Sequence, residues 1–249
     1  MFTPVSFQQP QLVTNGLVFY ADSADRTSYP GYGTTWTSLN GPKTAALTNG
    51  PLFSSTNGGI ITFDGVDDFA RIDANTFGYS PGTTGELTLE IWVYPTGPFT
   101  SYVAEPPTTN LGGFFGQSYF DASIGWGLGT FTANGNNYWA FQVRHSGNIV
   151  QSGADSNLIF TTGSWYHVVG SFTRNDFSRT YINGQLKTSI SSTSLNGITL
   201  TPNNPNARIG STPNFFSGCR IAVAKLYNRP LSTAEVTQNF NAQRQRFNI

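Results

Sequence analysis

The side chains that could act as catalytic nucleophiles or bases are few in this 249-residue sequence. Its histidines are His145 and His167, its one cysteine is Cys219, and no serine stands in a Gly-x-Ser-x-Gly elbow. Nucleophilic catalysis needs a nucleophile with a base beside it. His167 lies in a β-type run, which predicts a hydrogen-bonded structural histidine, and Cys219 is expected to be an inert thiol, half-buried at the start of a strand. The sequence therefore disfavours a nucleophile-based enzyme.

Aspartate side chains in two loops offer the oxygen atoms that a hard cation requires. Asp22 follows one predicted strand, and the segment Asp64-Gly65-Val66-Asp67-Asp68 joins two others. Ca²⁺ is held by about six to eight such oxygens. The alternative is a simple turn, in which Asp and Gly satisfy nearby backbone groups. Both interpretations stay open; Asp22 and Asp68 are the candidate ligands of a structural calcium, and no other cofactor is expected.

Aromatic rings flanked by neutral polar side chains could bind sugars. A flat ring packs against the apolar side of a sugar, while amides or hydroxyls bond its hydroxyl groups. The candidates for contact with a glycan or a partner are Tyr32, Trp36, Tyr102, Phe114, Phe115, Tyr119, Tyr138 and Trp139. Because aromatic residues in strands more often belong to the core, no single one is favoured.

Several of these rings lie in the stretch from Pro95 to Phe120, which has several prolines and glycines and only weak alternation. It is the longest candidate loop in the sequence. Long loops inside compact domains are usually functional or disordered. We expect either a binding surface or a loop that packs against the rim of the domain.

Runs of β-branched and aromatic residues recur from residue 17 onward, separated by Gly, Asn and Pro clusters. That pattern is typical of a many-stranded antiparallel sandwich. In the run from Leu87 to Tyr94, residues 87, 89, 91 and 93 are aliphatic and should share the buried face of one strand. The dipeptide Asn183-Gly184 stands between two such runs and predicts a tight hairpin turn.

One helix is predicted, near the C-terminal end. Ser232-Thr233-Ala234-Glu235 matches a capping box, in which the first and last side chains satisfy each other's free backbone amides. After it, Val236, Phe240 and Phe247 recur on one helical face. The helix should span residues 232–246 and lie against the rim of the sandwich.

The chain length fits one domain. Residues 1–15 are polar and predict an extended N-terminal arm, so the domain proper is residues 16–249. Charged residues make up 10% of the sequence and the formal net charge is zero. Nucleic acid is disfavoured as a partner, because phosphates need a concentrated cationic face. No apolar run is long enough for membrane insertion.

The single cysteine excludes an internal disulfide, and the first residues do not read as a signal peptide. These features favour a protein made in a cytoplasm. They are compatible with assembly there into a larger particle.

Six segments, in order, carry a family resemblance: Gly16-Leu17-Val18-Phe19-Tyr20, Ile61-Thr62-Phe63-Asp64-Gly65-Val66-Asp67-Asp68-Phe69, Leu87 to Pro95, Trp165-Tyr166-His167-Val168-Val169, Tyr181-Ile182-Asn183-Gly184 and Ala224-Lys225-Leu226-Tyr227-Asn228-Arg229-Pro230-Leu231-Ser232. Together they resemble the laminin-G-like and pentraxin-like branch of the concanavalin A-like lectin and glucanase superfamily. The resemblance covers about residues 16 to 247 and implies an all-β fold, a two-sheet antiparallel jelly-roll β-sandwich with a concave face and a rim of loops. It implies no single activity.

The resemblance also makes glycoside hydrolysis a hypothesis. Hydrolases of this superfamily place acidic residues as Glu-x-Asp-x-Glu on one strand face. Here Glu86-Leu87-Thr88-Leu89-Glu90 keeps both ends but has Thr88 in the middle, and a glutamate at the place of Glu90 is usual and not catalytic in the laminin-G-like branch. Relatives often hold calcium at the rim, yet residues 221–224 lack the acidic side chains that relatives carry there.

The leading hypothesis is a non-enzymatic structural and adhesion module on the surface of a phage-like virion, in the capsid decoration or the tail. It is supported by a likeness of residues 238–247 to the ends of such domains in bacteriophage virion proteins. The expected partners are other virion proteins or cell-surface glycans, with oligomeric assembly plausible. The alternative is a free carbohydrate-binding lectin or sugar-binding appendage in the bacterial cytoplasm or at the cell surface.

Overall fold

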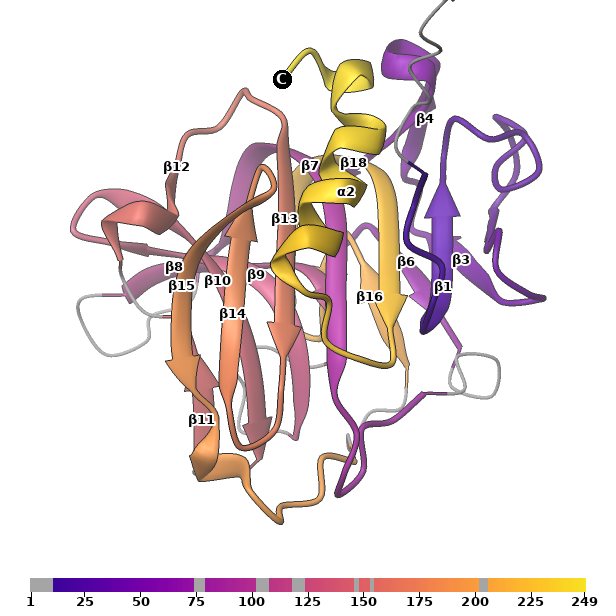
Figure 1. The fold of residues 1–249 in the computed structure, drawn as a ribbon. Helices are drawn as coiled ribbons and strands as arrows, with labels where there is room; N and C mark the ends of the chain where they lie inside the picture. The colour runs from indigo at the N-terminus through magenta and orange to yellow at the C-terminus, as the bar shows by residue number, and fades with distance from the viewer. Residues whose placement is uncertain are drawn as a thin grey trace, which may run out of the picture.

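The structure is a computed structural model that describes residues 11–73, 79–101, 108–117, 124–145, 148–152, 155–201 and 206–249. Two antiparallel sheets, A and B, pack face to face, and a helix near the C-terminus lies outside sheet A (Figure 1). The prediction of an all-β, two-sheet jelly-roll sandwich with one short C-terminal helix is confirmed. Within the described ranges, no helix is long and apolar enough to cross a membrane.

Sheet A has the order β15, β14, β13, β7 and β18. The other edge of β18 pairs with β5 and then β1, and β4 pairs with β5. The strands are β1 (Leu17–Asp22), β4 (Leu52–Ser54), β5 (Ile60–Asp64), β7 (Leu87–Ser101), β13 (Tyr166–Phe172), β14 (Phe177–Ile182), β15 (Gln185–Ser191) and β18 (Phe215–Tyr227). Asn183 and Gly184 have φ angles of 51° and 76° between β14 and β15, so the predicted hairpin is confirmed.

Sheet B has the order β2, β3, β6, β16, β8, β9 and β10, and both β11 and β12 pair with the far edge of β10. The strands are β2 (Thr35–Thr37), β3 (Thr44–Thr48), β6 (Phe69–Ile72), β8 (Thr108–Gly116), β9 (Gly125–Ala133), β10 (Asn136–His145), β11 (Asn148–Gln151), β12 (Ile159–Phe160) and β16 (Ala207–Ile209). The end of β7 crosses over to pair with β8, and β17 (Ser211–Thr212) forms a hairpin with β18.

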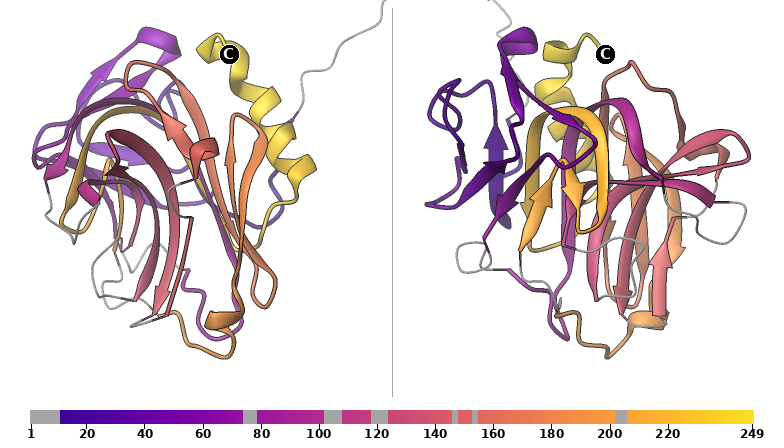
Figure 2. Two further views of the ribbon diagram at one scale, coloured as in Figure 1. Left: turned by 90° about the vertical axis from the view of Figure 1, so that its left-hand side faces the viewer. Right: turned by 180° about the vertical axis from the view of Figure 1, so that it is seen from behind.

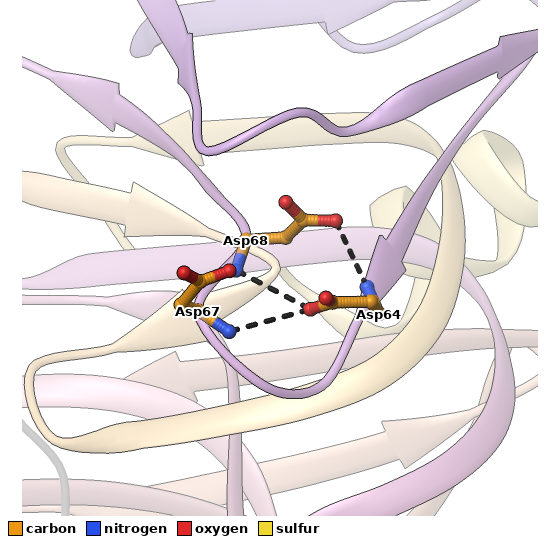
Figure 3. Close-up of side chains that lie close together, drawn as sticks. All are labelled: Asp64, Asp67 and Asp68. Atoms are coloured by element: carbon orange, nitrogen blue, oxygen red, sulfur yellow. Dashed lines mark hydrogen bonds between the residues drawn. The ribbon is translucent and has the colours of Figure 1, made fainter.

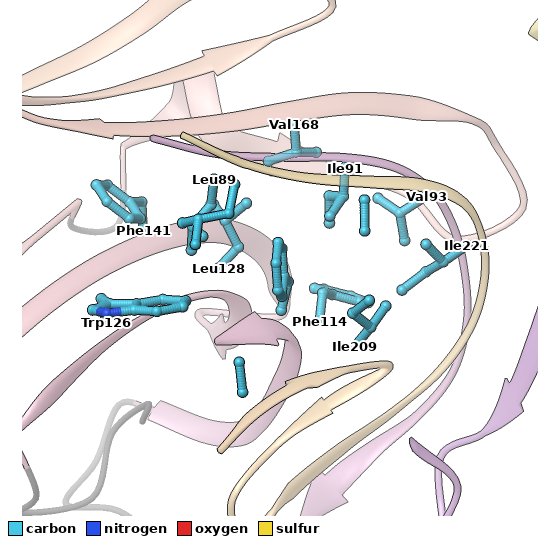
Figure 4. Close-up of a cluster of buried hydrophobic side chains, with 14 of the residues drawn as sticks. Leu89, Ile91, Val93, Phe114, Trp126, Leu128, Phe141, Val168, Ile209 and Ile221 are labelled. Atoms are coloured by element: carbon cyan, nitrogen blue, oxygen red, sulfur yellow. The ribbon is translucent and has the colours of Figure 1, made fainter. Parts of the chain in front are cut away.

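The core fills the space between the two sheets (Figure 4). Residues 87, 89, 91 and 93 of β7 are fully buried there, so the predicted inner face of this strand is confirmed. A Cβ atom at Gly170 of β13 would lie 2.2 Å from the ring of Phe141 on β10. Because Gly170 has no side chain, the Phe141 ring can pack directly against the backbone of sheet A.

The stretch from Pro95 to Phe120 is mostly strand, so its prediction as a long loop is wrong. Strand β7 continues to Ser101, and β8 begins at Thr108. A strand is recognised in a sequence by alternating apolar and polar side chains. Gly112 and Gly113 have no side chains, so this pattern is interrupted in β8. A Cβ at Gly113 would lie 2.2 Å from Thr212 Oγ1, so a neighbouring strand fills that space.

Helix α2 (Thr233–Gln243) and the 3₁₀ helix η4 (Arg244–Phe247) cover the outer face of sheet A, rather than its rim as predicted (Figure 2, left). The predicted capping box is confirmed, because Ser232 and Glu235 satisfy each other's backbone amides. On β7, the ring of Trp92 stacks against Phe247 with centroids 4.2 Å apart. The central strands of sheet A, β7, β13 and β18, are therefore buried on both faces.

Three further 3₁₀ helices join the strands: η1 (Thr56–Gly58), η2 (Ser156–Leu158) and η3 (Thr193–Leu195). Of the expected N-terminal arm, residues 11–15 are described. Val13 is buried, and its backbone amide donates to Asn239 Oδ1 of α2 at 2.8 Å. The segment before β1 and the C-terminal helix thus lie side by side on sheet A.

Candidate functional site

Five of the predicted contact aromatics belong to the core, with at most 6% of each side chain exposed: Trp36, Phe114, Phe115, Tyr138 and Trp139. They offer no free face to a ligand, which corrects their assignment as contact residues. The physical reason is the large apolar area of these rings, which favours burial when they fall on sheet positions.

Tyr32 is 76% exposed and is the one predicted contact aromatic that the described residues place at the surface. It lies in the loop that leads into β2. The loop is held internally, because the hydroxyl of Tyr29 donates to the carbonyl oxygen of Gly33 at 2.8 Å. Tyr102 and Tyr119 lie outside the described residues. The Tyr32 ring is therefore presented from a loop that needs little further ordering to bind.

Glu90 is the centre of a buried polar network between sheet A and α2. Lys225 Nζ donates to Glu90 Oε1 at 2.6 Å, and His167 Nε2 lies 3.1 Å from the same oxygen. Asn239 Nδ2 donates to Glu90 Oε2 at 2.7 Å, and Gln243 Oε1 accepts from Lys225 at 2.9 Å. Burial opposes ionisation, but the Lys225 charge and the bond with His167 outweigh it and hold the pKa of Glu90 at about 2. The predicted hydrogen-bonded role of His167 is confirmed.

The Glu86–Glu90 arrangement is engaged in holding the fold together. Glu86 Oε1 accepts from the backbone amide of Arg174 at 3.0 Å, and Glu90 is fully buried. The hydroxyl of Thr88 donates to the carbonyl of Arg229 and accepts from the amide of Leu231. A hydrolase needs two carboxylates that flank an accessible bond. This strand face instead contacts the segment that enters α2.

Cys219 is fully buried within β18, where we expected a half-buried thiol at a strand start. Burial raises the pKa of the Cys219 thiol well above its usual value, and nearby Asp68 adds to the effect. A thiol with a raised pKa is a poor nucleophile at neutral pH. The expectation of an inert thiol agrees with this environment.

The two candidate calcium ligands are engaged differently. Arg246 Nη1 donates to Asp22 Oδ1 at 2.6 Å, so this carboxylate joins η4 to β1. Asp68 instead lies with Asp64 and Asp67, and one carboxylate oxygen from each of the three falls within 4.8 Å of the others (Figure 3). Asp22 is thus paired with an arginine, whereas Asp68 is brought together with Asp64 and Asp67.

The donor chemistry of the Asp64–Asp67–Asp68 cluster suits a hard cation. Asp64 Oδ1 accepts from the backbone amides of residues 66, 67 and 68, and Asp68 Oδ2 accepts from the amide of Asp64 (Figure 3). These bonds agree with the interpretation of the segment as a turn in which aspartates satisfy nearby backbone amides. They use one carboxylate oxygen of Asp64 and one of Asp68. Burial, then the charges of Asp64 and Asp67, raise the pKa of Asp68 despite the Asp64 amide. A bound cation would offset that cost.

Two arginines face outward next to each other on sheet B. Arg71 of β6 pairs directly with Arg208 of β16 in the antiparallel register, while the residues beside them, Ala70, Ile72 and Ile209, are fully buried. Directly opposite residues on one sheet face have their Cβ atoms about 5 Å apart. The outward-facing residues around this pair, on β2, β3, β6 and β16, are called the arginine face. It consists of Thr35, Ala46, Thr48, Phe69, Arg71 and Arg208.

The two guanidinium groups have no carboxylate partner among the described residues. Arg208 packs over the ring of Phe69, with its guanidinium carbon 4.2 Å from the ring centroid. Burial, followed by the neighbouring charge of Arg71, lowers the pKa of Arg208. Like charges directly opposite each other destabilise a sheet. The arginine face therefore keeps an uncompensated pair of cations.

Sequence reasoning did not identify Arg71 and Arg208. The alternation in Phe69-Ala70-Arg71-Ile72 shows that Arg71 faces away from the core, and Ala207-Arg208-Ile209 shows the same for Arg208. What the sequence does not contain is the pairing of β6 with β16, which places the two charges side by side.

Residues 64–237 match the family described as the concanavalin A-like lectin/glucanases superfamily. No curated protein sequence matches the chain. Among solved structures, the fold is similar to the binding domain of Paraclostridial Mosquitocidal Protein 1, with a TM-score of 0.63 and 16% identity over 91% of this chain.

It is also similar to the botulinum neurotoxin serotype D ligand binding domain in complex with N-acetylneuraminic acid, with a TM-score of 0.64 and 12% identity over 92% of this chain. A third similar structure is Trypanosoma rangeli sialidase in complex with sialic acid, with a TM-score of 0.61 and 17% identity over 94% of this chain. The chain spans 52%, 51% and 34% of these three proteins, respectively, so they share the fold of one part. From the family match and the sandwich described above, this chain belongs to the concanavalin A-like lectin/glucanase superfamily.

Proposed function

We propose that the protein is a non-catalytic module that binds glycans, and that its contact surface is the arginine face together with Tyr32. The observation that carries the proposal is the difference in cover between the two outer faces. Helices α2 and η4 cover the central strands of sheet A on its outer face, whereas Ala46 and Arg71 on the outer face of sheet B are exposed to solvent. Exposed aromatic, hydroxyl and guanidinium groups on a rigid sheet are what sugar hydroxyls and rings require.

The surroundings of the acidic residues support binding rather than hydrolysis. Glu90 is bonded to Lys225, His167 and Asn239 beneath α2. Two of the solved structures with a similar fold contain sialic acids, which supports a sugar ligand for this family member. Both relatives are larger proteins, so their activities do not transfer with the fold.

The positions of the chain ends support display of this surface on a larger assembly. The segment before β1 and helix α2 lie together on sheet A, and the arginine face lies on the outer side of sheet B. Attachment through sheet A would leave the arginine face pointing outward. We propose a phage-like virion, in its capsid decoration or tail, as the assembly, with the particle formed in a cytoplasm.

A free lectin is the second candidate function. Quantifying the protein by mass spectrometry in purified particles separates the two. A fixed copy number in particles that persists through density-gradient purification supports the virion role. Recovery of the protein only in the soluble fraction would leave the lectin.

We also propose that the Asp64–Asp67–Asp68 cluster binds a structural Ca²⁺, with oxygens from all three side chains. When bound, the ion would offset two of the three negative charges of the carboxylates and fix the turn between β5 and β6. Strand β6 begins at Phe69, directly after the cluster, and carries Arg71. The ion would therefore steady one edge of the arginine face.

A glycan array and solution titration with the isolated protein test the glycan proposal. Tyr32→Ala should weaken binding of the best array ligands by about tenfold, since an exposed ring that stacks on a sugar behaves as a binding hot spot. The matched control is Phe177→Ala, because Phe177 is 40% exposed on β14 of sheet A. If the wild-type protein binds no glycan, or if both variants behave alike, the proposed surface is wrong.

A further inference from the structure

We propose that Arg71 and Arg208 act together to bind the acidic group of a glycan, either a carboxylate or a sulfate ester, so that acidic sugars are the preferred ligands. The inference rests on the proposed function, because it assigns a ligand class to the same surface. It uses three observations: the pairing of the two residues, the absence of a carboxylate partner for either of them among the described residues, and the side chains around them.

The pairing places two cationic groups within reach of one anion. Arg71 and Arg208 stand directly opposite each other on adjacent antiparallel strands, and both side chains leave the same face of sheet B. With Cβ atoms about 5 Å apart, two long side chains can converge on one small group. A guanidinium presents its N–H groups as a planar fork that matches two oxygens of a carboxylate or sulfate.

Three partly buried arginines of the described chain are each compensated by a carboxylate. Arg179 is bonded to Asp176 at 2.9 Å, Arg229 to Glu235 at 2.6 Å and Arg246 to Asp22 at 2.6 Å. Within the described residues, neither Arg71 nor Arg208 forms such a bond. An anionic ligand would supply the negative charge that the described residues do not place beside these two arginines.

The Phe69 ring orients the guanidinium group of Arg208. Arg208 packs over this ring at 4.2 Å, and a guanidinium stacked on a ring keeps its N–H groups in the exposed plane. The stacking restricts the side chain before the ligand arrives, which reduces the ordering that binding requires. Phe69 is thus a positioning residue for Arg208.

The neighbours of the arginine pair fit a sugar better than a long polyanion. Across β3 and β2, the same row of the sheet continues with Ala46 and Thr35, which are small and exposed. A small side chain leaves room for a ring, and a threonine hydroxyl can bond a sugar hydroxyl. Nucleic acid needs a continuous cationic track, whereas this chain has a net charge of zero. One acidic group on an otherwise neutral glycan matches the surface.

The test compares lactose, sialyllactose and lactose sulfated on galactose, each titrated calorimetrically into the full-length protein. We expect both acidic sugars to bind about tenfold more tightly than lactose, with an advantage that shrinks as salt is added. Arg71→Gln and Arg208→Gln should each remove the advantage and leave lactose binding in place. Arg71→Lys should recover part of it, because the charge remains but the fork is lost.

The matched control is Arg179→Gln, which removes the same charge from sheet A and should preserve the preference. Circular dichroism confirms that each variant is folded. A preference for sialyllactose alone identifies a carboxylate ligand, and a preference for the sulfated sugar alone identifies a sulfate ester.

Two results would overturn the inference. Equal affinity for lactose and the acidic sugars refutes the arginine site and leaves glycan binding intact. Absence of binding to any sugar refutes both the proposed function and the acidic preference. Tight binding to an unrelated single-stranded oligonucleotide, lost in both glutamine variants, would replace the sugar with a polyanion.

Discussion

The charged residues on the outer faces of the two sheets differ in burial and in ion-pair partners. On sheet A, Glu90 and Lys225 are fully buried beneath α2 and bonded to each other at 2.6 Å. On sheet B, Arg71 and Arg208 stand next to each other and have no carboxylate partner in the described ranges. Both sets of residues point away from the core on neighbouring strands. What differs is the element that covers them.

The comparison separates charges that shape the fold from charges that are free to bind. A buried ion pair is costly to desolvate, so it persists when every oxygen and N–H has a partner. Both carboxylate oxygens of Glu90 have partners, which come from three different elements. Two adjacent cations without carboxylate partners lower the stability of the fold, and destabilising groups of this kind are typical of functional surfaces. Four experiments would break or sharpen this contrast.

The largest effect should follow Glu90→Gln. The substitution leaves Lys225 buried without a counter-charge, and breaking a buried pair in this way costs about 3–5 kcal/mol in free energy of unfolding. Urea denaturation measures the loss. The control is Asp176→Asn, which removes an exposed pair with Arg179 and should cost less than about 1 kcal/mol. Equal losses in the two variants would mean that the network does not anchor α2.

Acid should act on the same network in two stages. Burial lowers the pKa of His167 below its usual 6.5, although Glu90 opposes the shift. As pH falls below about 6.5, the unfolded chain therefore takes up a proton that the folded protein resists, and stability falls. The pKa of Glu90 is held at about 2 against an ordinary 4.5, so its contribution is present above 4.5 and is lost as pH falls from there towards 2.

Thermal unfolding between pH 8 and pH 3 follows both stages. His167→Gln should flatten the upper stage and leave the lower one. A melting temperature that stays constant from about pH 7 to pH 4 would contradict the assignment.

Calcium should stabilise the side of the molecule that carries the arginine face. If the acidic cluster binds Ca²⁺, an ion concentration about a hundredfold above the dissociation constant adds about 2.7 kcal/mol to the free energy of unfolding. Asp68→Asn should abolish that gain, and Asp176→Asn should preserve it. A gain that survives Asp68→Asn would place the ion elsewhere, and no gain in the wild-type protein would leave the segment as a simple turn.

The smallest effect concerns the arginine pair without ligand. Arg71→Gln removes the repulsion across β6 and β16, so the free energy of unfolding should rise by about 0.2–1 kcal/mol. The variant should be more stable and yet bind acidic sugars less well. Arg179→Gln should show the opposite sign in stability, because Arg179 has a carboxylate partner. A loss of stability in Arg71→Gln would show that the pair is compensated in solution.

Much of the fold followed from local patterns. The alternation in residues 87–93 identified an inner face, Asn183-Gly184 identified a hairpin, and Ser232 with Glu235 identified the start of a helix. Each of these features depends on residues close together in sequence. The prediction failed where glycine replaced the alternating side chains, in β8, and it could not separate core aromatics such as Trp139 from surface ones such as Tyr32. Strand identity fixes which residues alternate, but it does not say which face is covered.

The sequence by itself determined that the chain is all-β, poor in histidine and cysteine, and rich in rings that must be buried. Only the tertiary structure decided which charges meet. Lys225 reaches Glu90 across 135 residues of sequence, and Arg208 meets Arg71 because β16 pairs with β6. Strand pairing is set by the packing of the whole sandwich, so no local pattern encodes it. That pairing decided that one set of charges is bonded beneath a helix and the other faces solvent.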